Sequence, residues 1–371
     1  MKKITLVLLL LALVASFSFA QGKGLIGIAM PETHVQRWIK DGEALKANAI
    51  KLGYTAEVNW ANADQQIQNA IIQAYLNKKP KALIIGNIND GVRSAVAAAA
   101  KQKVVVVAYD RLIQNSKDYN YFITFNNKNV GELQGKAIVE ALNLSAATAA
   151  SPKNITLFAG SSTDDNANFF YDGAIEVLAP YIDKGVLKVI GPYPKSSKDK
   201  ATFLQIATEN WQADIAKRRM EGLLINDAKA VTLDAILAPN DPIARAVIEA
   251  CKADAKYRSK LPIVTGQDAE FASVMSIKNG EQYMTIFKDT NKLAEAAIIL
   301  VDQIVRGVKP EDIKVPGAVV ASTVGLGAIG NTGQKEVITY LLQVQSITKN
   351  NINVPADAGF YPDAEAAQIK R

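Results

Sequence analysis

The chain has one cysteine and one histidine among 371 residues, and this scarcity excludes several kinds of chemistry. A single cysteine cannot form a disulfide within the chain, so packing must supply the stability. No CxxC, HxxxH or clustered acidic spacing occurs, so neither a metal nor another cofactor is predicted. Cys251 lies among alanines and valines of an expected amphipathic helix, which predicts a buried, inert thiol. His34 lies in an expected loop without a Ser or Cys motif, which argues against nucleophilic catalysis.

The chain also lacks a strong excess of charge. Lys and Arg number 42 against 36 Asp and Glu, a formal net charge of +6. Two of these lysines, Lys2 and Lys3, lie in an N-terminal segment that we expect to be removed, and +6 less these two gives +4. The remaining basic residues are scattered, without a block or interleaved aromatics. Nucleic acid is therefore not predicted as a partner.

The N-terminal segment has the pattern of a secretory signal peptide. Lys2 and Lys3 precede the apolar run Leu6 to Val14, and the small-x-small sequence Ser18 to Ala20 follows. This order predicts a cleavable signal over residues 1–20. The alternative, a membrane anchor, is disfavoured because the run is short and no basic stop follows it. No cysteine follows the cleavage site for lipid attachment, so we expect a free, soluble mature protein.

Apolar runs alternate with amphipathic stretches along the rest of the chain. The length and the 49% hydrophobic content suffice for two domains, each with its own core. The expected strands are GLIGIAM, ALIIGN, VVVVAYD, YFITFN, ITLFAG, LKVIGPY, DAILAPN, PIVTGQD and YMTIF. The expected helices cover 39–52, 66–77, 92–102, 133–142, 174–181, 213–224, 243–253 and 293–305. This order predicts an α/β protein with two parallel sheets of about five or six strands.

The carboxyl ends of these strands are polar in a regular way. The run Val104 to Tyr109, for example, reads as a strand buried on both faces but ends in Asp110 and Arg111. Ligands of open parallel sheets bind at this edge. Any one such end could be a surface turn, whereas the whole set predicts the rim of a cleft suited to sugar hydroxyls. The other polar ends are 31–38, 87–90, 161–166, Asn240 with Asp241, Gln267 with Asp268, and Lys288.

Seven segments in order resemble one family. They are MPETHVQRWIKDG, VVVVAYDRLIQNS, YFITFNNKNVGELQGKA, AGSSTDDNANFFYDGA, APND, VTGQDAEFASV and EQYMTIFKDT. Together they are similar to the periplasmic monosaccharide-binding proteins of the xylose-binding and multiple-sugar-binding branch. The resemblance extends over residues 24–360.

The resemblance implies a type I periplasmic-binding fold, with two doubly wound parallel-sheet lobes joined by a three-strand hinge. Matching segments place the three crossovers near residues 125–127, 266–268 and 338–340. The N-lobe would then comprise residues 24–126 and 268–337. The C-lobe would comprise 127–267 and 338–360, followed by a tail at 361–371.

The resemblance also implies a set of sugar contacts. Carboxylates such as Asp110 would accept hydrogen bonds from sugar hydroxyls, and cations such as Arg111 would donate to them. The two tryptophans would pack flat against the C–H faces of a pyranose. The implied contacts are Arg37, Trp38, Asp110, Arg111, Asp164, Asn166, Trp211, Asn240, Asp268 and Lys288.

The implied role is capture of a monosaccharide in the periplasm by a monomeric, non-enzymatic protein. The sugar would be D-xylose or a related aldopyranose such as glucose, galactose or arabinose, delivered to the permease of an ABC importer. Some relatives also serve a chemoreceptor or a sensor kinase.

Two segments depart from the family pattern. The loop 161–165 lacks a proline, and a Gly-rich insertion at 316–335 is expected to be a surface flap.

Three alternatives carry less weight. A secreted glycoside hydrolase could use a carboxylate pair among Asp164, Asp165 and Asp268, but cations implied in the same cleft would keep those groups ionised. The sequence GxGxxG at 22–27 precedes and enters the first strand, whereas a dinucleotide fingerprint follows it. A repressor domain would need a helix-turn-helix at the N-terminus, where a signal peptide is expected instead.

Overall fold

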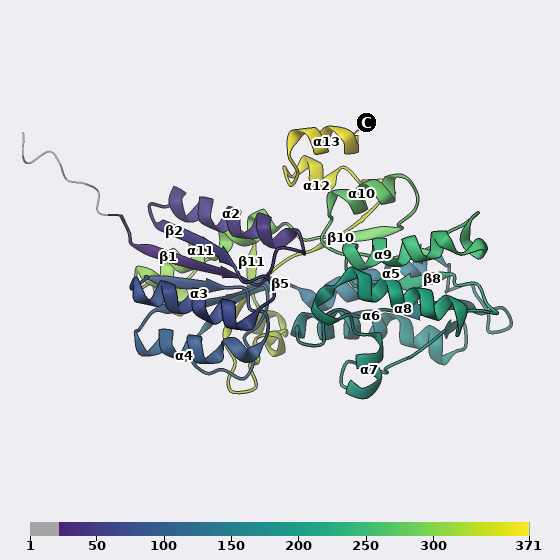
Figure 1. The fold of residues 1–371 in the computed structure, drawn as a ribbon, viewed down its shortest axis with the longest axis horizontal. Coiled ribbons are helices and arrows are strands. Elements are labelled where there is room, and N and C mark those ends of the chain that lie inside the picture. Colours follow the sequence, from purple (N-terminus) through teal and green to yellow (C-terminus); the bar gives the residue numbers. More distant parts are fainter. Residues whose placement is uncertain (1–21, 371) are drawn as a thin grey trace, which may run out of the picture.

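The computed structural model describes residues 22–370, so the expected signal peptide lies outside the described residues. Two α/β lobes lie side by side (Figure 1). The N-lobe is built on a seven-stranded sheet, and the C-lobe on a four-stranded sheet together with a two-stranded one. Within residues 22–370, no helix is both long enough and apolar enough to cross a membrane.

The N-lobe sheet has the strand order β11-β12-β5-β4-β3-β1-β2 and is parallel except at β11. Its central strands are buried on both faces, as continuous β-branched runs predict. The strands are β1 (Leu25–Met30), β2 (Thr55–Trp60), β3 (Ala82–Ile85), β4 (Val105–Tyr109), β5 (Tyr121–Phe125), β11 (Ala318–Val320) and β12 (Ile338–Leu342).

Helices cover both faces of this sheet. In Figure 1, α2 (Arg37–Lys51) lies above the sheet, and α3 (Gln65–Asn77) and α4 (Arg93–Lys101) lie below it. The helix α11 (Thr290–Val305) packs beside α2. Successive strand residues serve opposite cores, since Ile28 packs with the α2 side whereas Ala29 packs with the α3 side.

The C-lobe sheet has the order β7-β6-β8-β9 and is parallel throughout. The strands β10 and β13 form a separate antiparallel pair. Cys251 is buried in α9, as expected, and burial raises the pKa of its thiol to about 12. The strands are β6 (Lys153–Leu157), β7 (Leu187–Val189), β8 (Ala235–Leu237), β9 (Ile263–Val264), β10 (Met284–Phe287) and β13 (Gln345–Thr348). The helices are α5 (Asn127–Ala141), α6 (Asp165–Asp183), α7 (Lys200–Ile206), α8 (Ala213–Ile225), α9 (Asp241–Ala253), α10 (Phe271–Lys278), α12 (Val354–Asp357) and α13 (Asp363–Lys370).

The chain crosses between the lobes after β5, after β10 and between β12 and β13. The first crossover falls within the expected range 125–127, but the other two differ from expectation. Residues 266–268 hydrogen-bond to β10, because Ile286 N donates to Gly266 O at 3.2 Å and Asp268 N donates to Ile286 O at 2.8 Å. Residues 268–287 therefore stay with the C-lobe. Residues 338–342 stay with the N-lobe because β12 pairs with β5 along its whole length.

The Gly-rich insertion 316–335 is packed against the N-lobe, not a free flap. It begins with the edge strand β11, and its buried residues Ala321 and Ile329 share a core with Leu112 and Tyr119. The backbone N–H of Asn115 donates to a carbonyl of this segment at 2.7 Å. The insertion therefore covers one edge of the sheet.

The C-terminal segment connects parts of both lobes. Helices α12 and α13 lie beside α10, at the top of Figure 1. The hydroxyl of Tyr361 donates to the carbonyl of Ala269 at 2.5 Å. From the N-lobe, Lys40 of α2 places its Nζ 5.5 Å from the ring centre of Phe360 and 5.6 Å from that of Tyr361. The tail thus buttresses the loop that follows Asp268.

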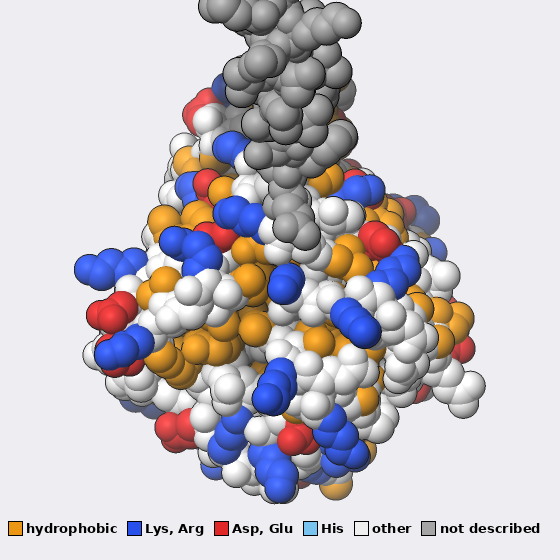
Figure 2. All heavy atoms as spheres, turned by 90° about the vertical axis from the view of Figure 1, so that its left-hand side faces the viewer, with side chains coloured by type: hydrophobic (Ala, Val, Ile, Leu, Met, Phe, Trp, Pro, Cys, Tyr) orange, Lys and Arg blue, Asp and Glu red, His pale blue; other side chains and the backbone are white. Residues whose placement is uncertain are grey.

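The outer face of the N-lobe carries mixed charge. Figure 2 shows Lys and Arg spread across this face, with Asp and Glu and apolar areas between them. The basic residues on this face form no continuous stripe of the kind that tracks a nucleic-acid backbone.

Candidate functional site

All ten residues expected at the cleft line one cavity between the lobes. Val35, Phe170 and Gln267 complete its lining. The free space is about 30 Å³, comparable to one water molecule's share of liquid volume. The polar side chains therefore meet one another across the cavity. The expected residues are Arg37, Trp38, Asp110, Arg111, Asp164, Asn166, Trp211, Asn240, Asp268 and Lys288.

The N-lobe contributes a buried carboxylate held by arginine. Asp110 follows β4 with a φ of 63°, a left-handed conformation that Asp tolerates better than most residues. Its Oδ1 accepts a hydrogen bond from Arg37 Nη1 at 3.0 Å. Burial alone raises the pKa of Asp110, but Arg37, Lys288 and Arg111 lower it by more. The net pKa lies below the usual value, so the carboxylate is ionised at neutral pH.

Trp38 supports the two arginines of this wall. The guanidinium carbon of Arg37 lies 4.7 Å from the ring centre of Trp38, and that of Arg111 lies 4.9 Å from it. The backbone carbonyl of Trp38 accepts from Trp60 Nε1 at 3.0 Å, which ties the start of α2 to β2. The indole is thus a platform for cations, and only 1% of Trp38 is exposed.

The C-lobe contributes a second buried carboxylate at the start of α6. Asp164 caps this helix, because its Oδ1 accepts from Asn166 N at 3.0 Å. Its Oδ2 accepts from Trp211 Nε1 at 3.1 Å and lies 2.8 Å from Arg111 Nε of the N-lobe. Asn166 also reaches across, donating from Nδ2 to Asp110 O at 2.9 Å. Burial raises the pKa of Asp164 despite the opposing effect of Arg111.

Trp211 depends on a glycine beneath it. A Cβ on Gly160 would lie 2.0 Å from Cη2 of the indole, so no larger residue fits there without displacing the ring. Phe170 packs edge-on against Trp211, with ring centres 6.3 Å apart. On the same lobe, Asn240 caps α9 by accepting from Ile243 N at 3.2 Å. The C-lobe wall is therefore built from two aromatic rings and two helix caps.

The last two expected residues lie close to the connections between the lobes. Lys288 places its Nζ 2.9 Å from Asp268 Oδ1, and Arg37 Nη1 lies 4.0 Å from the same oxygen. Asp268 has a φ of 96°, so its backbone is strained and is held in place by the surrounding structure. The Nζ of Lys288 also lies 5.7 Å from the ring centres of Phe125 and Phe170.

Several charged neighbours of the site are not among the ten expected contacts. Arg111 Nη2 donates to Glu32 at 3.1 Å, and Arg37 Nη2 donates to Asp41 at 2.5 Å. Burial raises the pKa of Asp41 even though Arg37 lowers it. His34 Nε2 lies 2.9 Å from the carbonyl of Asn210 on the other lobe. Glu32 and His34 belong to the segment MPETH, but no spacing rule shows which loop side chains fold back onto the site.

Two polar atoms of the lining lack both a hydrogen-bond partner and an ion-pair partner among residues 22–370, namely Arg37 Nε and Gln267 Oε1. One is a donor and the other an acceptor, and a sugar hydroxyl can satisfy either. Leaving such a buried group unpaired costs about 1–3 kcal/mol. Within the described residues, no group of three or more His, Cys, Asp or Glu is placed to hold a metal ion. The cavity is thus equipped for a neutral, polyhydroxylated ligand.

Comparisons with known proteins agree with this chemistry. Residues 26–309 match the family described as periplasmic binding protein domain. The chain is 37% identical to the multiple sugar-binding periplasmic protein SbpA of Azospirillum brasilense, over 96% of this chain and 95% of that protein. It is 32% identical to the D-xylose-binding periplasmic protein of Escherichia coli, over 92% of each.

A solved structure has the same architecture. The ABC transporter solute-binding protein of Clostridium phytofermentans with bound β-D-glucose superposes with a TM-score of 0.81 at 35% identity. The match covers 92% of this chain and 99% of that one. The fold is therefore the type I periplasmic-binding fold, as the sequence predicts. The family match and these relatives show that this chain belongs to the periplasmic binding protein family.

Proposed function

We propose that this protein binds one monosaccharide between its lobes in the periplasm and presents it to the permease of an ABC importer. The ligand class is an aldopyranose such as D-xylose, glucose, galactose or arabinose. Support comes from the relatives, whose names specify multiple sugars and D-xylose, and from the solved structure that holds β-D-glucose.

The observation that carries the proposal is the alternation of buried charges across the cavity. Asp110 and Asp164 can accept from hydroxyls, while Arg37, Arg111 and Lys288 can donate to them. Hydrogen bonds to charged groups are worth about 1.5–3 kcal/mol each. Six or more such bonds, about 9–18 kcal/mol in total, would exceed the ~8 kcal/mol of a micromolar site before the cost of association is subtracted.

Binding requires the lobes to part. Side chains that meet across the cavity, such as Arg111 and Asp164, leave only about 30 Å³ free, so a sugar enters when the lobes part and is enclosed when they close again. We expect a sugar to take the place of these contacts, with its hydroxyls bridging the two side chains. The three crossovers provide the hinge for this motion, because the chain passes from one lobe to the other through them.

The proposed role is not enzymatic. Glycoside cleavage needs one protonated and one ionised carboxyl on either side of the bond. Here Asp268 lies against Lys288, and Asp164 lies against Arg111 and serves as a helix cap. These contacts suit carboxylates that act as fixed hydrogen-bond acceptors better than they suit a general acid.

The test is calorimetric titration of residues 21–371, purified free of ligand, with D-xylose, D-glucose, D-galactose, L-arabinose and D-ribose. Tight one-to-one binding of xylose alone would identify a pentose receptor, and comparable binding of several aldopyranoses would identify a broad one. Folded protein that binds none of the five would refute the proposed ligand class. Incubation with nitrophenyl glycosides tests the enzymatic alternative, and turnover of any of them would refute the non-enzymatic role.

A further inference from the structure

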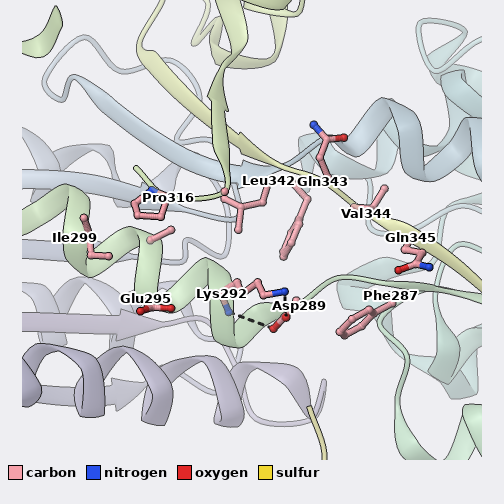
Figure 3. Close-up of a pocket in the computed structure, with 13 residues that line it drawn as sticks. Phe287, Asp289, Lys292, Glu295, Ile299, Pro316, Leu342, Gln343, Val344 and Gln345 are labelled. Carbon is pink, nitrogen blue, oxygen red and sulfur yellow. Dashed lines mark hydrogen bonds and ion pairs between the residues drawn. The ribbon is translucent and has the colours of Figure 1, made fainter. Parts of the chain in front are cut away.

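A second and larger cavity lies at the hinge. Figure 3 shows it between the crossover that carries Phe287 and Asp289 and the one that carries Leu342 to Gln345, with α11 along one side. Its volume is about 630 Å³, within the range of about 300–1,000 Å³ typical of small-molecule sites. Nothing in the proposed sugar-binding role uses it.

The hinge cavity and the sugar cavity lie on opposite sides of one crossover. Phe287 and Asp289 line the hinge cavity, whereas Lys288 between them lines the sugar cavity. Consecutive residues of an extended segment point to opposite sides, which explains this division. Phe125 also lines the hinge cavity, and its ring centre lies 5.7 Å from Lys288 Nζ. The two cavities thus share a thin wall.

Both lobes contribute to the hinge cavity. Ala296 and Ile299 of α11 belong to the N-lobe, while Phe287 and Gln345 belong to the C-lobe strands β10 and β13. A rotation about the crossovers that narrows one cavity must therefore widen the other. In this structure the sugar cavity has about 30 Å³ and the hinge cavity about 630 Å³.

The lining of the hinge cavity indicates the chemistry of a ligand. Its floor is apolar and includes Phe125 and Phe287. At the rim, Asp289 Oδ2 is paired with Lys292 Nζ at 3.2 Å. Glu295 is exposed and has no ion pair or hydrogen bond within residues 22–370, so the charged lining residues Asp289, Lys292 and Glu295 carry a net charge of −1. Aromatic faces also favour a cation.

We propose that the hinge cavity binds a small molecule that joins an apolar ring to an ammonium group, and that its occupation favours lobe closure and tightens sugar binding. The ring would pack on the aromatic floor, and the ammonium would pair with Glu295. The coupling to sugar rests on the proposed function, whereas occupation of the cavity does not. Linkage requires the sugar to tighten amine binding by the same factor.

The first experiment uses benzylamine as the probe, with benzyl alcohol and benzoate as matched neutral and anionic controls. We expect benzylamine to bind with millimolar affinity and to strengthen sugar binding about threefold or more, within the usual range of coupling. The variant Glu295→Gln should lose most of the preference for benzylamine over benzyl alcohol while keeping its sugar affinity. The proposed site would be overturned if benzoate bound as tightly as benzylamine, or if benzylamine did not bind at all.

The second experiment fills the cavity covalently. Ile299 is half-buried and lines the hinge cavity. The larger side chain of Ile299→Trp should fill this cavity and oppose its narrowing. Sugar binding should then tighten about threefold or more. Ala296→Trp is a second filling variant, and Asn291→Trp on the exposed side of α11 is the control with unchanged affinity. Unchanged sugar affinity in both folded filling variants would overturn the coupling. Wild-type protein that binds no sugar would instead refute the proposed function, and the benzylamine titration would still test the site.

Discussion

Replacing the carboxylate of Asp110 by an amide is the sharpest test of the sugar site. Asp110→Asn keeps the size of the side chain and suits the left-handed backbone at this position, where φ is 63°. It removes the negative charge that accepts from Arg37 at 3.0 Å. Alanine would be a poorer choice, because it would add backbone strain and a small void.

The expected loss follows from the hydrogen bond that a sugar hydroxyl makes to this charge. Such a bond contributes about 1.5–3 kcal/mol, and about 1.4 kcal/mol corresponds to a tenfold change in affinity. Asp110→Asn should therefore bind its best sugar about 10- to 100-fold more weakly. Calorimetric titration measures this change, and urea unfolding of the same sample shows whether the lobe remains stable.

A distant carboxylate provides the matched control. Asp302 on α11 accepts from Lys23 at 2.8 Å and from Tyr54 at 3.0 Å, far from the sugar cavity. Burial raises its pKa, but these partners and Arg306 lower it by more. Asp302→Asn should thus destabilise the fold at neutral pH, with the loss fading as pH falls through the folded-state pKa, and leave sugar affinity unchanged. Folded Asp110→Asn with wild-type affinity would refute the assignment of Asp110 to the site.

Three further predictions concern the surroundings of the site. Gly160→Ala should weaken sugar binding about tenfold or more by displacing Trp211, as titration and tryptophan fluorescence would show, and an unmoved ring would contradict the packing argument. Tyr361→Phe removes the donor to Ala269 and should cost about 1 kcal/mol in urea unfolding, whereas no loss would mean that the bond adds nothing. Burial and the nearby acid Glu270 raise the pKa of Asp241 to about 8. Because the pKa of Asp241 is higher in the folded than in the unfolded state, the free energy of unfolding should fall as pH rises from about 4 to 8. Asp241→Asn should reduce this fall by at least about 1 kcal/mol. An unchanged pH dependence of unfolding would contradict the raised pKa of Asp241.

The sequence predicts most of the buried strands but misses both edge strands of the N-lobe sheet. Runs such as Val104 to Tyr109 are apolar throughout, because both faces of a central parallel strand are covered. The strand Thr55–Trp60 lies at the sheet edge with half-exposed polar residues, so its apolar pattern is too weak to detect. The strand Ala318–Val320 is apolar but only three residues long, within a Gly-rich segment, so its pattern is too short to predict a strand.

The lobe boundaries could not be read from local pattern. Pairing of Ile338–Leu342 with β5 joins residues more than 200 positions apart, and no spacing rule reports such a contact. The site residues were easier to predict than the lobe boundaries, because polar residues at the carboxyl ends of strands converge in any open parallel sheet. The rule brought Asp110 and Asp268 into one cavity, and their contact with sugar stays a prediction. It placed Glu32 in the rim range 31–38 without singling it out and missed Asp41, and both take part through their arginine partners.

The position of β12 has a consequence for biosynthesis. This strand lies between β5 and β11, yet more than 200 residues separate it from β5 in the chain. Until residue 342 is available, the N-lobe sheet has a gap and β5 exposes an unpaired edge, which is a template for aggregation. Pairing so distant in sequence is also slow to form. The N-lobe of the nascent chain therefore stays incompletely folded until residue 342 has emerged, and a chaperone that shields the edge of β5 would serve it during that interval.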